Sequence, residues 1–279
     1  MSSTPKIGLF GINMGLDPDA MARVTQAAEA AGFESVWTGE HIVLPDPQAP
    51  PSPAAPETPM VDTAATLAYL AAVTDTIKLG SGIIILPQRQ PAVLAKSLAS
   101  VDHLSGGRLL FGLGVGYLEP EMTACSTPMA RRGERADEYL AAMRVLWTTD
   151  AGSFDGEFVT FDSVTANPKP TQPDLHTVVG GHSRRALQRA HELAHGWYGF
   201  RRDLETTAGD IARLRQIAED SDRPDALGAL EISITPPGRL TDADLDAYAE
   251  MGVDRLVLLL GAQRGEDACM RLIDEHASA

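Results

Sequence analysis

A glutamate and a histidine, Glu40 and His41, stand just beyond the short apolar run of residues 35–38. Such a run predicts a buried strand, and parallel-strand barrel enzymes keep their catalytic groups at the carboxyl ends of the strands. An imidazole titrates near neutral pH and can move a proton to or from a substrate oxygen during hydride transfer. A histidine is more often structural, but this position favours catalysis, so we predict that His41 is catalytic. Glu40 would orient His41 or face solvent.

A second candidate for chemistry is the turn Gly180-Gly181-His182-Ser183, which leads into a segment of helical period. Free backbone N–H groups and the dipole at a helix N-terminus favour anions, and the Ser183 hydroxyl can contact a phosphate. Ser183 can equally serve only as the N-cap of the helix. The residues alone favour neither interpretation.

Glycines also lie inside two apolar runs. Gly80 and Gly82 interrupt one of them, and the stretch Gly112-Leu113-Gly114-Val115-Gly116, followed by Tyr117, forms the end of the next. The second stretch matches part of a dinucleotide-binding motif but has no helix directly after it, which excludes a Rossmann site. Glycine in a strand indicates a bulge or a flat ligand against the backbone, and we expect a ring system to approach Gly114 and Gly116.

The elements that must position these residues alternate along the chain, which is typical of a parallel sheet. The expected strands cover residues 6–13, 35–38, 77–84, 109–115, 177–179, 196–200, 230–234 and 255–260. The expected helices begin near Pro18, Asp62, Pro91, Arg131, Arg184, Leu204, Thr241 and Glu266. Eight units favour a closed barrel over an open doubly wound sheet. We predict an α/β fold, one (β/α)8 TIM barrel domain spanning residues 1–279.

Long connections interrupt the alternation. Residues 45–59 are too rich in proline for a helix or a central strand, and they would form a lid over the catalytic face or a disordered surface loop. Residues 116–129 form a second insertion on that face. Residues 153–169 include Phe154-Asp155-Gly156-Glu157-Phe158, which predicts a small hairpin with an Asp-Gly turn.

Composition excludes several partners. The formal net charge of −15 repels nucleic acid and anionic lipid, and no apolar run is long enough to cross a membrane. Cys125 and Cys269 are too few for a disulfide framework, and no cluster has metal-ligand spacing. No secretory signal is visible, so we expect a cytoplasmic protein without a metal.

Arginine pairs at 131–132, 184–185 and 201–202 follow expected strands. These side chains would attract an anionic cofactor or form ordinary salt bridges.

Together these stretches resemble the luciferase-like superfamily, and most closely its small actinobacterial branch that uses the deazaflavin coenzyme F420. The resemblance covers essentially the whole chain. It is carried by residues 32–37 with Glu40 and His41, and by residues 77–82, 91–116, 167–170, 180–183 and 196–197. It implies a barrel of the bacterial-luciferase type, with insertions at the C-terminal face and the cofactor ring over the strand ends.

The resemblance also implies roles for individual residues. His41, Glu40 and Tyr117 would be catalytic, and a cis peptide would join Gly82 to Ile83. The residues implied in cofactor binding are Trp37, Gly82, Ile83, Gly114, Gly116 and, for phosphate, Gly180, Gly181, His182 and Ser183. Relatives often carry an acid where this chain has Tyr117, so Glu119 or Glu121 would take that role or stay solvated. His195 replaces the usual aspartate, with no evident consequence.

Three functions follow as alternatives. The first is an oxidoreductase that transfers a hydride between a small organic substrate and coenzyme F420. The second is an FMN-dependent monooxygenase, and the third is a barrel that has lost its chemistry, since fold alone never proves function. The family further implies a homodimer.

Overall fold

The computed structural model describes residues 4–259 and 265–277, and its parallel strands close into a barrel. The strand order is β3-β2-β1-β11-β10-β9-β8-β5-β4, and β3 also pairs with β5, which closes the ring. Because β3 and β4 both pair with β5, they act as one interrupted strand, and the barrel has eight strand positions, as predicted. The barrel strands are β1 Lys6–Phe10, β2 Ser35–Thr38, β3 Lys78–Ser81, β4 Ile84–Ile85, β5 Leu109–Gly114, β8 Thr177–Gly180, β9 Gly196–Phe200, β10 Glu231–Thr235 and β11 Arg255–Leu259. The end of the last expected strand, Leu260, lies outside the described residues.

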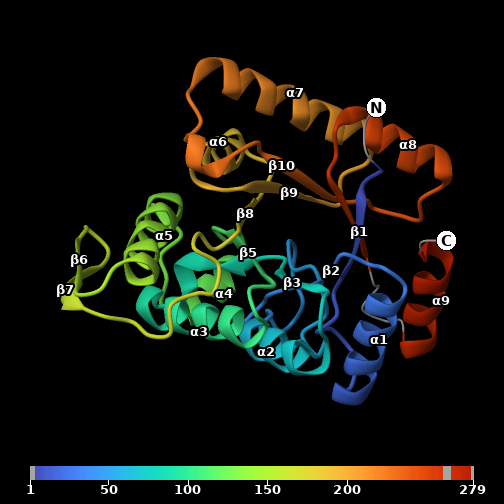
Figure 1. Ribbon diagram of the computed structural model, residues 1–279, viewed down its shortest axis with the longest axis horizontal. Helices are drawn as coiled ribbons and strands as arrows, with labels where there is room; N and C mark the ends of the chain where they lie inside the picture. Colours follow the sequence, from blue (N-terminus) through green and yellow to red (C-terminus); the bar gives the residue numbers. More distant parts are fainter. Residues whose placement is uncertain (1–3, 260–264, 278–279) are drawn as a thin grey trace.

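Helices lie outside the strands around the barrel (Figure 1). They are α1 Pro18–Ala30, α2 Thr63–Val73, α3 Pro91–Leu104, α5 Arg132–Thr148, α6 Arg184–Leu193, α7 Leu204–Asp220, α8 Asp242–Met251 and α9 Glu266–His276. Their starts agree with the predicted ones to within one residue, and side-chain caps fix several of them. The side chains of Asp17, Asp62 and Ser183 each accept a bond from the N–H three residues on. None of the described helices is both long and apolar enough to cross a bilayer.

The strand expected at residues 77–84 is interrupted. β3 ends at Ser81, β4 begins at Ile84, and the Gly82–Ile83 peptide between them is cis, as predicted. The Ser81 hydroxyl donates to the Gly112 carbonyl and accepts from the Gly112 N–H, both at 2.8 Å. A side chain at Gly112 would place its Cβ 1.8 Å from the Ser81 carbonyl oxygen. Gly112 therefore allows the bulge, residues 82–83 between β3 and β4, to lie against β5.

The three long connections are also described. β6 Gly152–Asp155 and β7 Thr160–Val164 form the predicted hairpin, which lies beyond α5 (Figure 1). The Asp155-Gly156 pair begins the turn, but the connection continues to Val159, because Glu138 accepts bonds from the N–H groups of residues 157, 158 and 159. The proline-rich segment returns beside the end of β1, where Asn13 Nδ2 donates to the Val61 carbonyl at 2.7 Å. The insertion at 116–129 contains a short helix, α4 Glu119–Ala124, which was not predicted.

Inside the barrel, aromatic side chains fill the space between the strands. Trp37 stacks on Tyr198 with ring centroids 5.4 Å apart, and both side chains are buried. At the amino ends of the strands, the fully buried Arg255 binds both carboxylate oxygens of Glu34, at 2.8 and 2.9 Å. The interior is thus closed at its base, and the polar groups available for chemistry lie at the carboxyl ends.

Candidate active site

His41 is held by a carboxylate that lies 80 residues away in the sequence. Its Nδ1 is 2.8 Å from Oε2 of Glu121, and the Ile42 N–H donates to the other carboxylate oxygen at 2.6 Å. The Glu121 side chain is 0% exposed and that of His41 is 10% exposed. Both oxygens of the Glu121 carboxylate thus have a partner in the loop that follows β2. Of the two carboxylates considered in this insertion, Glu121 meets His41 and Glu119 is exposed.

Helix α4 carries Glu121 to this position because the chain turns sharply after β5. Gly116 has a φ of +78°, and a Cβ there would lie 2.9 Å from Sδ of Met122. Met122 is fully buried next to Glu121, and the guanidinium of Arg132 donates to the Gly116 carbonyl at 3.0 Å. These contacts fix α4 over the end of β5 and direct Glu121 toward the loop after β2. The sequence signal was weak: Leu118 and Met122 are one helical turn apart, with Pro120 between them.

Tyr117 lies on the other side of the imidazole. Its hydroxyl is 3.5 Å from Nε2 of His41, and the two rings meet edge to face with centroids 5.9 Å apart. Burial raises the pKa of Tyr117, and the nearby Glu121 charge adds to this rise. The residue is nevertheless 49% exposed. His41 therefore directs Nδ1 into the protein and Nε2 toward the rim.

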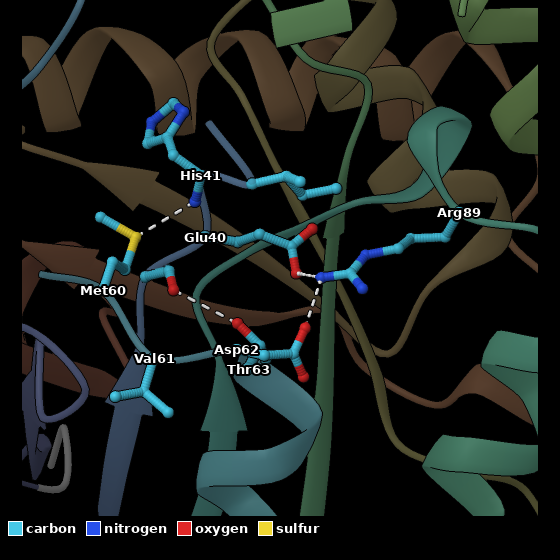
Figure 2. Close-up of a pocket in the computed structure, with 9 residues that line it drawn as sticks. Glu40, His41, Met60, Val61, Asp62, Thr63 and Arg89 are labelled. Atoms are coloured by element: carbon cyan, nitrogen blue, oxygen red, sulfur yellow. Dashed lines mark hydrogen bonds and ion pairs between the residues drawn. The ribbon is translucent and has the colours of Figure 1, made fainter. Parts of the chain in front are cut away.

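Glu40 does not orient His41, contrary to one of the two predicted roles, nor does it face solvent. Its carboxylate accepts from the Ile85 N–H at 2.9 Å and from Arg89 at 2.6 Å, and Arg89 also binds Asp62 at 2.9 Å. Figure 2 shows the Glu40 carboxylate directed to Arg89 and the His41 ring directed away from it. Burial raises the pKa of Glu40, and Arg89 opposes this effect. Through these bonds Glu40 connects the loop after β2 with the segment after β4. Glu40 and His41 both line a pocket of about 160 Å³.

The side chain of Ile83, on the bulge, occupies the space beside two of the strand glycines. A Cβ at Gly114 would lie 2.1 Å from Cδ1 of Ile83, and one at Gly180 would lie 2.7 Å from the same atom. Gly116 likewise makes room for Ile85 and Met122. Side chains of the protein thus give these glycines a packing role, and the approach of a cofactor ring to Gly114 and Gly116 stays a prediction. Ile83 itself is only partly buried.

Trp37 does not line a ligand site either. Its indole is fully buried, its Nε1 donates to the Ser35 hydroxyl at 2.8 Å, and Arg255 lies 5.7 Å from its ring centroid. A Cβ at Gly80 would lie 2.4 Å from the indole ring. The expectation that Trp37 contacts a cofactor is corrected, because the residue packs inside the barrel with no surface left for a ligand.

The turn after β8 has the cap predicted as one alternative. Ser183 Oγ accepts from the Ala186 N–H at 3.2 Å, and Gly181 has a φ of +124°. The Nε2 atom of His182 is buried and has no hydrogen-bond partner among the described residues. Burial lowers the pKa of His182, and Arg202 lowers it further. Capping by Ser183 leaves the first N–H groups of α6 without helical acceptors, so an anion can still bind there.

Three of the six arginines expected to make the catalytic face positive are paired with acidic side chains. Arg131 binds Glu134 and Glu157, Arg202 binds Asp210, and Arg184 lies 3.7 Å from Asp220. Ordinary salt bridging, the second of the predicted alternatives, therefore describes these side chains.

Sequence comparison finds one family model and several relatives. The model described as luciferase-like monooxygenase matches residues 3–271. An uncharacterized protein of Mycobacterium tuberculosis is 31% identical over 271 residues, which cover 93% of each chain. An FMNH(2)-dependent dimethylsulfone monooxygenase of Pseudomonas putida is 35% identical over 133 residues, which cover 46% of this chain and 36% of that protein.

Solved structures share the fold at lower identity. The monooxygenase RslO1 of Streptomyces bottropensis superposes with a TM-score of 0.77 and 21% identity, covering 97% of this chain and 98% of that one. An F420-dependent secondary alcohol dehydrogenase, in complex with an F420-acetone adduct, also gives a TM-score of 0.77, with 14% identity and 98% of each chain covered. At these identities the likeness shows the fold alone.

Proposed function

The chain belongs to the luciferase-like monooxygenase family, and on that premise we propose that it is an oxidoreductase that uses coenzyme F420. It would transfer a hydride between a carbon atom of a small organic substrate and the deazaflavin. One observation carries the proposal: the imidazole of His41 lies at the carboxyl end of β2 and bonds Glu121 at 2.8 Å, which leaves Nε2 directed to the rim. The F420-dependent alcohol dehydrogenase of the same fold supports the choice of cofactor.

The residues present fit such a cofactor at two places. Ile83, on the bulge between β3 and β4, would support the ring from below, since the neighbouring Gly114 and Gly180 leave its side chain in place. Gly181, His182 and Ser183 would hold the phosphate, and Nε2 of His182, which has no partner among the described residues, would donate to it. When bound, the deazaflavin supplies the hydride donor or acceptor.

The side chains around His41 would handle the proton. Nε2 of His41 would take a proton from a substrate oxygen or return one, and the buried Glu121 carboxylate would stabilise the charged imidazolium. Tyr117, with its hydroxyl 3.5 Å from Nε2, would border the substrate. Glu40, which the sequence placed among the catalytic residues, would act only through the packing of β2.

An FMN-dependent monooxygenase is the second candidate function. It is favoured by the 35% identity with the FMNH(2)-dependent dimethylsulfone monooxygenase, which extends over 46% of this chain. Family membership fits either cofactor, because both ring systems would lie over the same bulge.

We also propose that the enzyme is a cytoplasmic homodimer. Helix α2 contains no charged residue, and Tyr69 on α2 and Val93 on α3 are exposed, which supports a contact between copies on this face.

A direct test is to titrate the purified protein with coenzyme F420 and, separately, with FMN, following fluorescence at one low salt concentration. Tight binding of the deazaflavin alone supports the proposal. Tighter binding of FMN would favour the second candidate function, an FMN-dependent monooxygenase. If the protein binds neither cofactor, both candidate functions are contradicted. His182→Ala is the matched variant: it should weaken binding of the phosphate-bearing cofactor without changing the far-ultraviolet circular dichroism.

A further inference from the structure

We propose that Glu121 is a positioning residue that fixes His41 in one neutral tautomer, with the proton on Nδ1 and the lone pair of Nε2 facing the substrate. The catalytic consequence rests on the proposed function, but the tautomer itself is a property of the protein alone. The carboxylate at position 121 would thereby decide whether the resting imidazole accepts a proton or donates one.

The argument begins with the hydrogen bonds of the carboxylate. Oε1 of Glu121 accepts from the Ile42 N–H at 2.6 Å, and Oε2 lies 2.8 Å from Nδ1 of His41. An ionised carboxylate can only accept, so the hydrogen in the second bond belongs to Nδ1.

Burial and packing prevent an alternative arrangement. The Glu121 side chain is fully buried, and α4 is held at Gly116 by Arg132 and by the buried Met122. The carboxylate therefore cannot turn away to solvent, and the His41 ring cannot flip without losing its only charged partner among the described residues. Tyr117 does not compete, because 3.5 Å is long for a hydrogen bond to Nε2.

The consequence is a preferred class of substrate. With a lone pair on Nε2, the resting enzyme binds a substrate that presents a hydroxyl hydrogen. In the forward step the substrate C–H bond would break, and its hydride would go to the oxidised deazaflavin, which is the oxidant. The O–H proton passes to Nε2, and a carbon–oxygen double bond forms. Glu121 would balance the positive charge of the imidazolium, and with a neutral imidazole at rest the step would begin from an alcohol.

The variant Glu121→Gln tests the tautomer directly. The Ile42 N–H still requires an acceptor, so the amide oxygen should face it and the amide nitrogen should face Nδ1 of His41. An amide nitrogen only donates, which forces the proton of His41 onto Nε2. Glu119→Gln is the matched control, since Glu119 belongs to the same helix but is exposed.

The measurement is nitrogen-15 NMR of the imidazole nitrogens in the labelled protein without cofactor, at a pH where histidines are neutral. The His41 signals are identified by their loss in His41→Asn. We expect protonated Nδ1 in the wild type, in Glu119→Gln and in Glu121→Asp, and protonated Nε2 in Glu121→Gln. Protonated Nε2 in the wild type, or the same tautomer in Glu121→Gln as in the wild type, overturns the proposal. If Glu121→Gln does not fold, the wild-type spectrum alone decides.

Kinetics separate this proposal from the proposed function. With coenzyme F420 and an alcohol, Glu121→Gln should lower kcat at least tenfold with little change in KM, and Glu121→Asp should recover part of the loss. Absence of turnover in every form, with the NMR result as expected, would refute the proposed function and leave the tautomer assignment standing. Unchanged kcat in Glu121→Gln, with the tautomer inverted, would refute the role of that tautomer in catalysis.

Discussion

The imidazole rings of His176 and His195 are stacked at the base of the barrel, with their centroids 4.8 Å apart and an interplanar angle of 22°. The Thr177 N–H donates to Nδ1 of His195 at 3.0 Å, so that nitrogen carries no proton. Nε2 of His195 lies 3.2 Å from Asp174, and Nε2 of His176 lies 3.5 Å from Glu231. The pair links the first residues of β8, β9 and β10 and requires a neutral His195.

Stability should therefore fall as the solution becomes mildly acidic. Burial, and then the neighbouring His176, lower the pKa of His195 from its usual 6.5. In the unfolded chain the histidine takes up a proton as the pH falls through about 6.5, whereas in the folded chain it resists. The free energy of unfolding is thus highest above 6.5 and decreases below it, until the folded pKa is passed. Urea denaturation between pH 8 and 5 measures this slope.

The variant His195→Gln should flatten that slope. Glutamine keeps an acceptor for the Thr177 N–H but does not titrate. His103→Gln is the control, because His103 is exposed on α3 and its removal should leave the slope unchanged. Equal slopes in the wild type and His195→Gln would show that other groups set the acid sensitivity.

Removal of Arg89 should destabilise the protein strongly. Arg89→Met would leave the buried Glu40 carboxylate without its cation, and breaking one side of a buried pair costs about 3 to 5 kcal/mol. Thermal and urea unfolding give the value. Arg23→Met, which removes the exposed pair with Glu266, should have a much smaller effect. Equal losses in the two variants would mean that Glu40 does not depend on Arg89.

A side chain at Gly114 should clash with Ile83, and a smaller residue at position 83 should relieve the clash. Gly114→Ala would bring its Cβ to 2.1 Å from Cδ1 of Ile83, and overpacking of this kind costs about 1 to 3 kcal/mol. Ile83→Val removes that atom, so the double variant should regain most of the lost stability. Additive losses in the double-mutant cycle would contradict the contact. Fluorescence titration with coenzyme F420 on the same variants would show whether the bulge also supports the ring.

Replacement of His41 should stop turnover without releasing the cofactor. We expect His41→Ala to lower kcat roughly 100- to 10,000-fold, the usual contribution of a positioned acid or base. Binding of coenzyme F420 should stay within about twofold of the wild type, as followed by fluorescence. Tyr117→Phe, which keeps the ring but removes the hydroxyl 3.5 Å from Nε2, should lose much less activity. Full activity in His41→Ala would exclude the proposed proton transfer.

The barrel was predictable from local features, and the site only in part. Strands β2 and β9 agree with the expected residues, and helices begin within a residue of the predicted starts, because caps such as Asp17 and Ser183 are local signals. Helix α4 was missed because it has only six residues. Glu40 was expected to orient His41 because the two residues are consecutive, but its buried carboxylate bonds the Ile85 N–H and Arg89 instead. The bond from Glu121 to His41 spans 80 residues, so no periodicity reports it.

The aromatic filling of the barrel has a kinetic consequence. Trp37 and Tyr198 occupy the interior, and Arg255 with Glu34 closes the amino end, so the described side chains fill the barrel axis. We therefore expect every molecule that binds at His41 to enter and leave at the carboxyl ends of the strands. Two ligands that share one opening cannot exchange independently: the one bound deeper arrives first and departs last. Steady-state kinetics should therefore follow a compulsory order, with inhibition at high concentrations of the outer ligand.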